Sequence, residues 1–179
     1  IPVGNKGLVI EKVDGPSHLK VVEEFGYEMY MHCGAIRKVL LAWQTPAFID
    51  EYFKNIILHD QAFPHVRPDD LREELKKIRQ DGYAITHGEY VTDALGIGAP
   101  VFNSDGELAG SIGIIAPEIR VDTPEFLDTQ KDLVQFYASS LSLGYAFSDA
   151  YPVFLRFVPM HAWSQAYALS QSLPQCSCL

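Results

Sequence analysis

The hydrophobic pattern of this chain changes its period at Gly82, and this change constrains the fold more than any other feature. Before the glycine, residues 67–81 carry apolar side chains at helical spacing, with charged residues covering the other faces. These apolar side chains are Leu71, Leu75 and Ile78. The pattern predicts an amphipathic helix, and Gly82 stands where a glycine commonly ends one.

After Gly82 the pattern becomes that of strands. Residues 83–86, 94–102 and 107–115 are extended in character, and residues 103–106 (NSDG) predict a hairpin turn between the last two. No internal repeat is visible in the sequence. Strands joined by a hairpin and combined with helices predict an α+β domain, with an antiparallel sheet flanked by helices.

Shorter signals predict the remaining elements. Thr45 followed by Pro46 is typical of a helix start, because threonine caps the first turn and proline fits its first position; Thr123 and Pro124 repeat this pair. The expected elements are strands over residues 7–13 and 19–25, helices over residues 35–43 and 46–54, a loop over residues 56–67 and a long final helix from Thr123.

The composition limits the classes of function. The net charge of −9 leaves no basic surface to neutralise phosphates, so this chain by itself should not bind DNA. No apolar stretch reaches the roughly 18 residues that a membrane helix needs. Three cysteines, two of them crowded at residues 176 and 178, do not form a disulfide framework. A reducing, cytoplasmic location is therefore expected.

The two ends of the sequence are unusual. The chain opens on strand-like residues without a methionine or a signal peptide, so we expect a fragment without its N-terminal part. Residues 145–179 contain seven aromatic residues but only Asp149 and Arg156 as charged groups. This tail either packs on an exposed groove, such as that of a partner chain, or is not the native end. We therefore expect one domain over residues 1–144, followed by an atypical tail.

A reactive pair at His32 and Cys33 is the first chemical candidate. Adjacent residues point apart on a regular backbone, which makes them a poor nucleophile and base, and no CxxC or HxxxH spacing supports a metal site. A metal would need further ligands from elsewhere, such as His87 or Glu89. A histidine that lines a pocket beside a small buried thiol explains the pair better.

Glycines in the expected strands are the second candidate. Gly96 and Gly98 resemble a phosphate-binding loop, but no helix follows them. A catalytic triad that uses Ser104 is also disfavoured, because the sequence around Ser104 is not that of a nucleophile elbow. Glycines within a strand let a ligand or a second backbone approach closely. Gly110 and Gly113 in the next strand invite the same interpretation.

Three blocks, taken together, resemble the C-terminal effector-binding domain of IclR-family transcription regulators. They are residues 31–43 (MHCGAIRKVLLAW), 71–90 (LREELKKIRQDGYAITHGEY) and 97–121 (IGAPVFNSDGELAGSIGIIAPEIRV). The resemblance extends over residues 9–144. It implies a GAF-like, profilin-like fold that acts as a homodimer or tetramer. It also implies that a winged helix-turn-helix domain and the first strand of the effector domain are absent from this chain.

The resemblance also implies an effector-binding site. By position, its residues are Ala35, Ile36, Thr86, Gly96, Gly113 and Ile115. The backbone N–H groups of the first two are expected to meet a carboxylate. The resemblance implies a small organic acid or an aromatic compound as the effector. Acid-binding members carry Asp, Cys and two Ser at the last four positions, so we expect a roomier, more apolar pocket here and favour the larger, aromatic ligand.

Arg37 is a further departure from the family, which usually has a small residue just before the lysine. Its side chain either reaches the pocket as a counter-ion or points to solvent.

Three functions follow from these observations. We expect an effector-sensing and oligomerisation domain of a bacterial transcription regulator, with no catalysis, cofactor or metal. DNA would be bound only through the missing domain. The alternatives are a small-molecule enzyme that uses Cys33 or His32, and a dimerisation module with a collapsed pocket.

Overall fold

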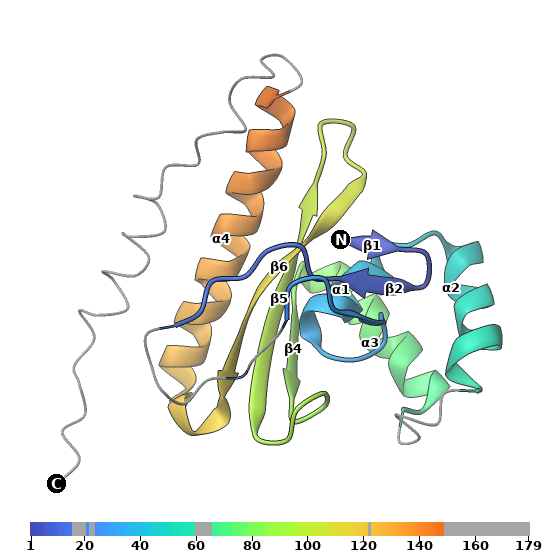
Figure 1. Ribbon diagram of the computed structural model, residues 1–179, viewed down its shortest axis with the longest axis horizontal. Coiled ribbons are helices and arrows are strands. Elements are labelled where there is room, and N and C mark those ends of the chain that lie inside the picture. The colour runs from blue at the N-terminus through green and yellow to red at the C-terminus, as the bar shows by residue number, and fades with distance from the viewer. Residues whose placement is uncertain (16–20, 22–23, 60–65, 122, 149–179) are drawn as a thin grey trace, which may run out of the picture.

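The computed structural model describes residues 1–15, 21, 24–59, 66–121 and 123–148 (Figure 1). Its strands are β1 (Pro2–Val3), β2 (Lys6–Leu8), β3 (Glu28–Tyr30), β4 (Ala84–His87), β5 (Ala94–Phe102) and β6 (Leu108–Pro117). Its helices are α1 (Ala35–Ala42), α2 (Pro46–Tyr52), α3 (Pro68–Asp81) and α4 (Pro124–Ser148), with a π-helix at Phe53–Ile57 and a 3₁₀ turn at Glu118–Arg120. The predicted α+β class is confirmed.

The larger sheet is antiparallel, with β5 between β4 and β6. Helix α4 packs on one face of this sheet and α1 on the other, so β5 is buried along nearly its whole length (Figure 1). The hairpin between β5 and β6 was predicted correctly. The Asn103 side chain stabilises it by accepting hydrogen bonds from the backbone N–H groups of Asp105 and Glu107.

The N-terminal strands form a separate three-stranded antiparallel sheet, which differs from the single sheet that we expected. β1 and β2 make a short hairpin, and β3 pairs with β2. The strand predicted over residues 7–13 ends at Leu8, and β3 was not predicted. The strand predicted over residues 19–25 lies largely outside the described residues.

The helices on the α1 side of the sheet form one apolar core with β4. Thr45 caps α2 as predicted, because its hydroxyl accepts a hydrogen bond from the Phe48 N–H at 3.2 Å. The chain then continues into the π-helix, where the sequence predicted a loop from residue 56. Phe53 and Ile57 of this segment are buried in the same core, which explains why the helical path extends to Ile57. Residues 60–65 of the predicted loop lie outside the described residues.

The predicted end of α3 can be compared with the structure at Gly82. Gly82 has φ 78°, and its N–H donates to the Ile78 carbonyl, so it ends α3 in the left-handed conformation as predicted. The long final helix predicted from Thr123 is present as α4, which ends at Ser148. None of the described helices combines the length and apolar composition needed to cross a bilayer.

Candidate functional site

The N-terminus of α1 lies directly against the larger sheet because two strand residues have no side chains. A Cβ atom on Gly98 would lie 2.7 Å from the Ile36 Cα, and one on Gly113 would lie 2.4 Å from the Ile36 Cγ1. The Ser111 hydroxyl also donates to the Ile36 carbonyl at 2.9 Å. These strand glycines therefore admit a second backbone, which was one of the two explanations offered by the sequence.

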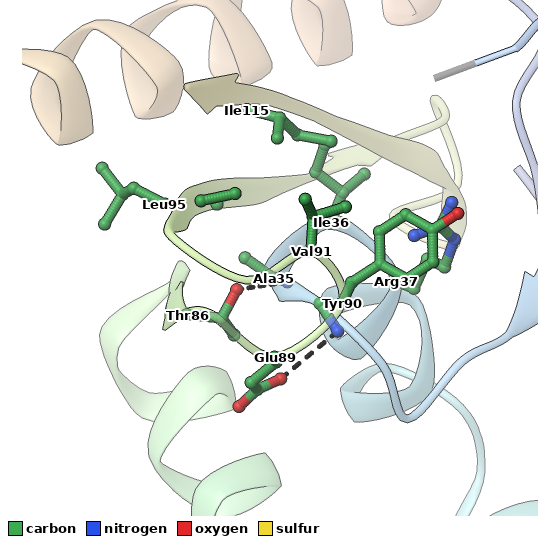
Figure 2. A pocket seen from close by; sticks show the side chains of 12 residues that line it. Ala35, Ile36, Arg37, Thr86, Glu89, Tyr90, Val91, Leu95 and Ile115 are labelled. Atoms are coloured by element: carbon green, nitrogen blue, oxygen red, sulfur yellow. Dashed lines mark hydrogen bonds between the residues drawn. The ribbon is translucent and has the colours of Figure 1, made fainter. Parts of the chain in front are cut away.

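A pocket opens beside this contact, and we call it the α1 pocket (Figure 2). It is lined by residues 34–37, 89–91 and 94–96 together with Thr86 and Ile115. Five of the six residues predicted from the resemblance therefore line one pocket. Gly113 does not, because the side chain of Ile36 lies over it.

The expectation of a roomy pocket is wrong. The α1 pocket encloses about 30 Å³, which accommodates one or two water molecules. The space expected beside Gly98 and Gly113 is filled by the backbone and side chain of Ile36, and the space beside Gly96 by the Thr86 hydroxyl. Small residues leave free volume only if no neighbouring group fills the space beside them. Here α1 fills that space.

Two side chains already bind the backbone donors at the start of α1. The Ala35 N–H donates to the Thr86 hydroxyl at 3.1 Å, and the Gly34 N–H donates to a Glu89 carboxylate oxygen at 3.3 Å (Figure 2). A ligand carboxylate at this helix end would have to replace them. Sequence reasoning expected a free helix end because it could not locate these two acceptors.

Glu89 belongs to a charged cluster around the buried Lys38. The Lys38 ammonium contacts both oxygens of Glu74 at 2.7 and 2.8 Å and one oxygen of Glu89 at 2.5 Å. The Lys38 side chain is 4% exposed, whereas those of Glu74 and Glu89 are about one-third exposed. The cluster joins α1 to α3 and to the loop after β4.

Arg37 does not point to solvent, which removes one of the two orientations expected for it. Arg37 is 6% exposed and lines the α1 pocket, and its guanidinium lies 4.8 Å from the centre of the Tyr90 ring (Figure 2). This is a cation–π distance. The stem of Arg37 lies over Gly7 of β2, where a Cβ atom would come within 3.3 Å of the Arg37 Cγ.

A second pocket, which we call the α3 pocket, lies on the other side of Glu89. It encloses about 150 Å³ and is lined by His32, Cys33, Lys38, Val66, Arg67, Asp70, Leu71, Glu74 and Glu89. The predicted histidine beside a buried thiol is therefore present. The His32 imidazole makes a 2.9 Å hydrogen bond with the Tyr52 hydroxyl and stacks on Tyr30, so neighbouring side chains hold it in place.

Metal binding finds no support in this region. Among the described residues, no three His, Cys, Asp or Glu side chains form a group suited to a metal ion. The residues missed by sequence reasoning are Glu89 as a helix-end acceptor and Tyr90 as the partner of Arg37. Gly88 and Glu89 stand at the end of the second block of the resemblance, residues 71–90, and this position was the available signal.

Comparison with known proteins identifies the family. The family described as bacterial transcriptional regulator IclR C-terminal matches residues 1–143, and the chain belongs to this family. The uncharacterised HTH-type transcriptional regulator RhmR of Escherichia coli K12 is 31% identical over 115 residues, 63% of this chain and 44% of that protein. The homologues are transcriptional regulators.

Solved structures agree with this assignment. The crystal structure of the Thermotoga maritima IclR has a TM-score of 0.72 and 26% identity, covering 81% of this chain and 59% of that chain. The C-terminal domain of a Vibrio cholerae transcriptional regulator has a TM-score of 0.67 and 28% identity, covering 79% of this chain and 82% of that chain. The chain spans about half the length of the regulators that it matches.

Proposed function

We propose that this chain is the effector-sensing and oligomerisation domain of its regulator, and that the effector binds in the α1 pocket. The observation that carries the proposal is the combination of a buried cation, Arg37, with the start of α1 and apolar walls from Leu95 and Ile115. A positive charge beside a helix N-terminus favours an anion, and the apolar walls favour a short hydrocarbon portion. This is the chemistry of an organic acid.

In this proposal the ligand acts by binding one arrangement of the regulator more tightly than another. The domain forms a homodimer or tetramer, and the effector shifts the equilibrium between two such assemblies. The spacing of the winged helix-turn-helix domains then changes, and with it the affinity for DNA. No bond is made or broken, and the regulator works in the cytoplasm.

The narrow pocket changes the expected ligand. The sequence favoured a larger aromatic acid, whereas a pocket of about 30 Å³ would have to enlarge less for an acid of few atoms. A thermal-shift panel of pyruvate, glyoxylate and benzoate tests this. We expect the two small acids to raise the melting temperature more than benzoate does. A larger increase of the melting temperature with benzoate would instead support the aromatic ligand expected from the sequence.

Arg37 provides the test of the site itself. In Arg37→Met the shift caused by pyruvate should disappear, because the cation that pairs with the carboxylate is lost. The matched control is Arg79→Met, which removes an exposed arginine of α3 outside the pocket and should keep the shift. If no acid stabilises the unmodified chain, the dimerisation module without a ligand becomes the better explanation.

The competing enzymatic function rests on His32 and Cys33, which line the same 150 Å³ pocket. Cys33→Ala separates the two functions. We expect this variant to keep the acid-induced thermal shift, because Cys33 does not line the α1 pocket. Acid consumption by the unmodified chain, abolished in Cys33→Ala, would support the enzyme instead.

A further inference from the structure

The walls of the α1 pocket differ in how firmly they are held. Ala35 and Ile36 belong to α1, which is packed against the sheet, and Thr86, Gly96 and Ile115 belong to hydrogen-bonded strands. Residues 89–91 instead belong to the loop between β4 and β5, which is neither helix nor strand. An organic acid needs more than about 30 Å³, so the pocket must enlarge when one binds. This loop is the described wall that can move at least cost.

Backbone conformation and a backbone hydrogen bond fix the two ends of the loop over residues 88–93, and side-chain contacts fix its middle. Gly88 and Asp93 both have positive φ, and the Gly88 N–H donates to the Ala94 carbonyl at 2.8 Å. Between them, Glu89 contacts Lys38 and the Gly34 N–H, and Tyr90 lies on Arg37. The middle of the loop moves only if these side-chain contacts are exchanged for others.

The ion pair between Glu89 and Lys38 is the contact that can be replaced, because Lys38 has a second carboxylate partner. Two carboxylates, those of Glu74 and Glu89, form ion pairs with one ammonium. A buried ammonium must keep a partner, and Glu74 alone supplies two oxygens at 2.7 and 2.8 Å. Glu89 is therefore the surplus carboxylate, and it is the one that also lines the α1 pocket.

We propose that Glu89 is an internal competitor of the effector. Its carboxylate occupies the Gly34 N–H that an acid would use, and an incoming acid takes over this donor while Lys38 stays paired with Glu74. The Glu89 side chain then moves away from the start of α1 together with the loop of residues 88–93, and this movement enlarges the α1 pocket. The exchange replaces one carboxylate with another at the start of α1, so its charge is unchanged. This inference rests on the proposed function of the α1 pocket.

Calorimetric titration of the 179-residue chain with pyruvate and benzoate tests the competition. Glu89→Gln should lower the Kd of the acid about five- to tenfold, because the competing charge and its ion pair are removed. Glu74→Gln is the matched control. It removes the other carboxylate from the same ammonium without touching the α1 pocket, and it should leave the Kd within about twofold or raise it.

The rate of amide hydrogen exchange in the loop tests the loop movement separately. A change in the charge of the pocket alone would not alter this rate. Without any acid, the amides of residues 89–92 should exchange faster in Glu89→Gln than in the unmodified chain. An unchanged exchange rate would overturn the loop movement. Acid binding that is equal or weaker in Glu89→Gln would overturn the competition but leave the sensor function intact. Absence of acid binding in every variant would overturn both.

Discussion

Gly113 shows how a single residue determines the position of the site. A Cβ atom at this position would lie 2.2 Å from the Ile97 carbonyl oxygen of the neighbouring strand and 2.4 Å from the Ile36 side chain. The first of these atoms belongs to the backbone and cannot rotate away. Gly113 therefore allows α1 to rest on β6, and the α1 pocket is formed at the edge of that contact.

Gly113→Ala should destabilise the fold by about 3 kcal/mol, because the strand or α1 must move to make room for the methyl group. Chemical denaturation of the variant measures this free energy of unfolding. Gly110→Ala on the same strand is the control. Its Cβ would meet the Ile1 side chain at 3.3 Å, and Ile1 lies at the chain terminus, so the cost should stay below about 1 kcal/mol. Equal losses in the two variants would contradict this account of Gly113.

At the scale of elements, the ends of the helices are set by local chemistry. Gly82 ends α3 with φ 78°, and the nearest atom to a Cβ there would be 3.6 Å away, so space is not the constraint. Gly144 lies inside α4, and a Cβ there would meet nothing within 4 Å. The same substitution therefore has opposite consequences at the two positions.

Gly82→Ala should lower the free energy of unfolding by about 1 kcal/mol, because alanine is strained in the left-handed conformation. Gly144→Ala should raise it by about 0.5–1 kcal/mol, because alanine is the better residue inside a helix. Thermal denaturation of both variants compares the signs. A melting temperature that falls in both would show that Gly144 is not in a regular helix.

Local signals explain which elements the sequence could predict. Helix α3, strand β5 and the hairpin at residues 103–106 follow from periodicity, a cap or a turn, and these were correct. Strand β3 has three residues and exists because it pairs with β2, and the π-helix is ordered by burial of Phe53 and Ile57. Such tertiary causes leave no periodic signal in the sequence.

The lining of the α1 pocket was predictable to a similar extent. Five residues that line the α1 pocket were named from the family resemblance, which carries spatial information that a single pattern lacks. The role of Glu89 was missed because its ion pair with Lys38 joins residues 51 positions apart. The volume was misjudged because the packing of Ile36 onto Gly113 depends on how α1 lies on the sheet.

At the scale of the whole molecule, the charge of this chain opposes DNA binding. The net charge of −9 opposes binding to a polyanion, so the chain alone should not bind duplex DNA measurably at physiological salt. Fluorescence anisotropy with a labelled 30-base-pair duplex checks this, and we expect no saturation below about 10⁻⁴ M protein. Binding in the micromolar range that falls steeply with salt would reveal a basic surface that the composition hides.

The contact between Arg37 and Gly7 joins the α1 pocket to the N-terminal sheet. Because Gly7 has no side chain, the backbone of β2 rests directly on the stem of Arg37, the same residue whose guanidinium faces the α1 pocket. In the proposed function, a ligand that shifts the guanidinium would also shift the stem, and the stem contacts β2 of the N-terminal sheet directly. Arg37 would then couple the α1 pocket to β2, together with Leu40, whose side chain also lies against Gly7.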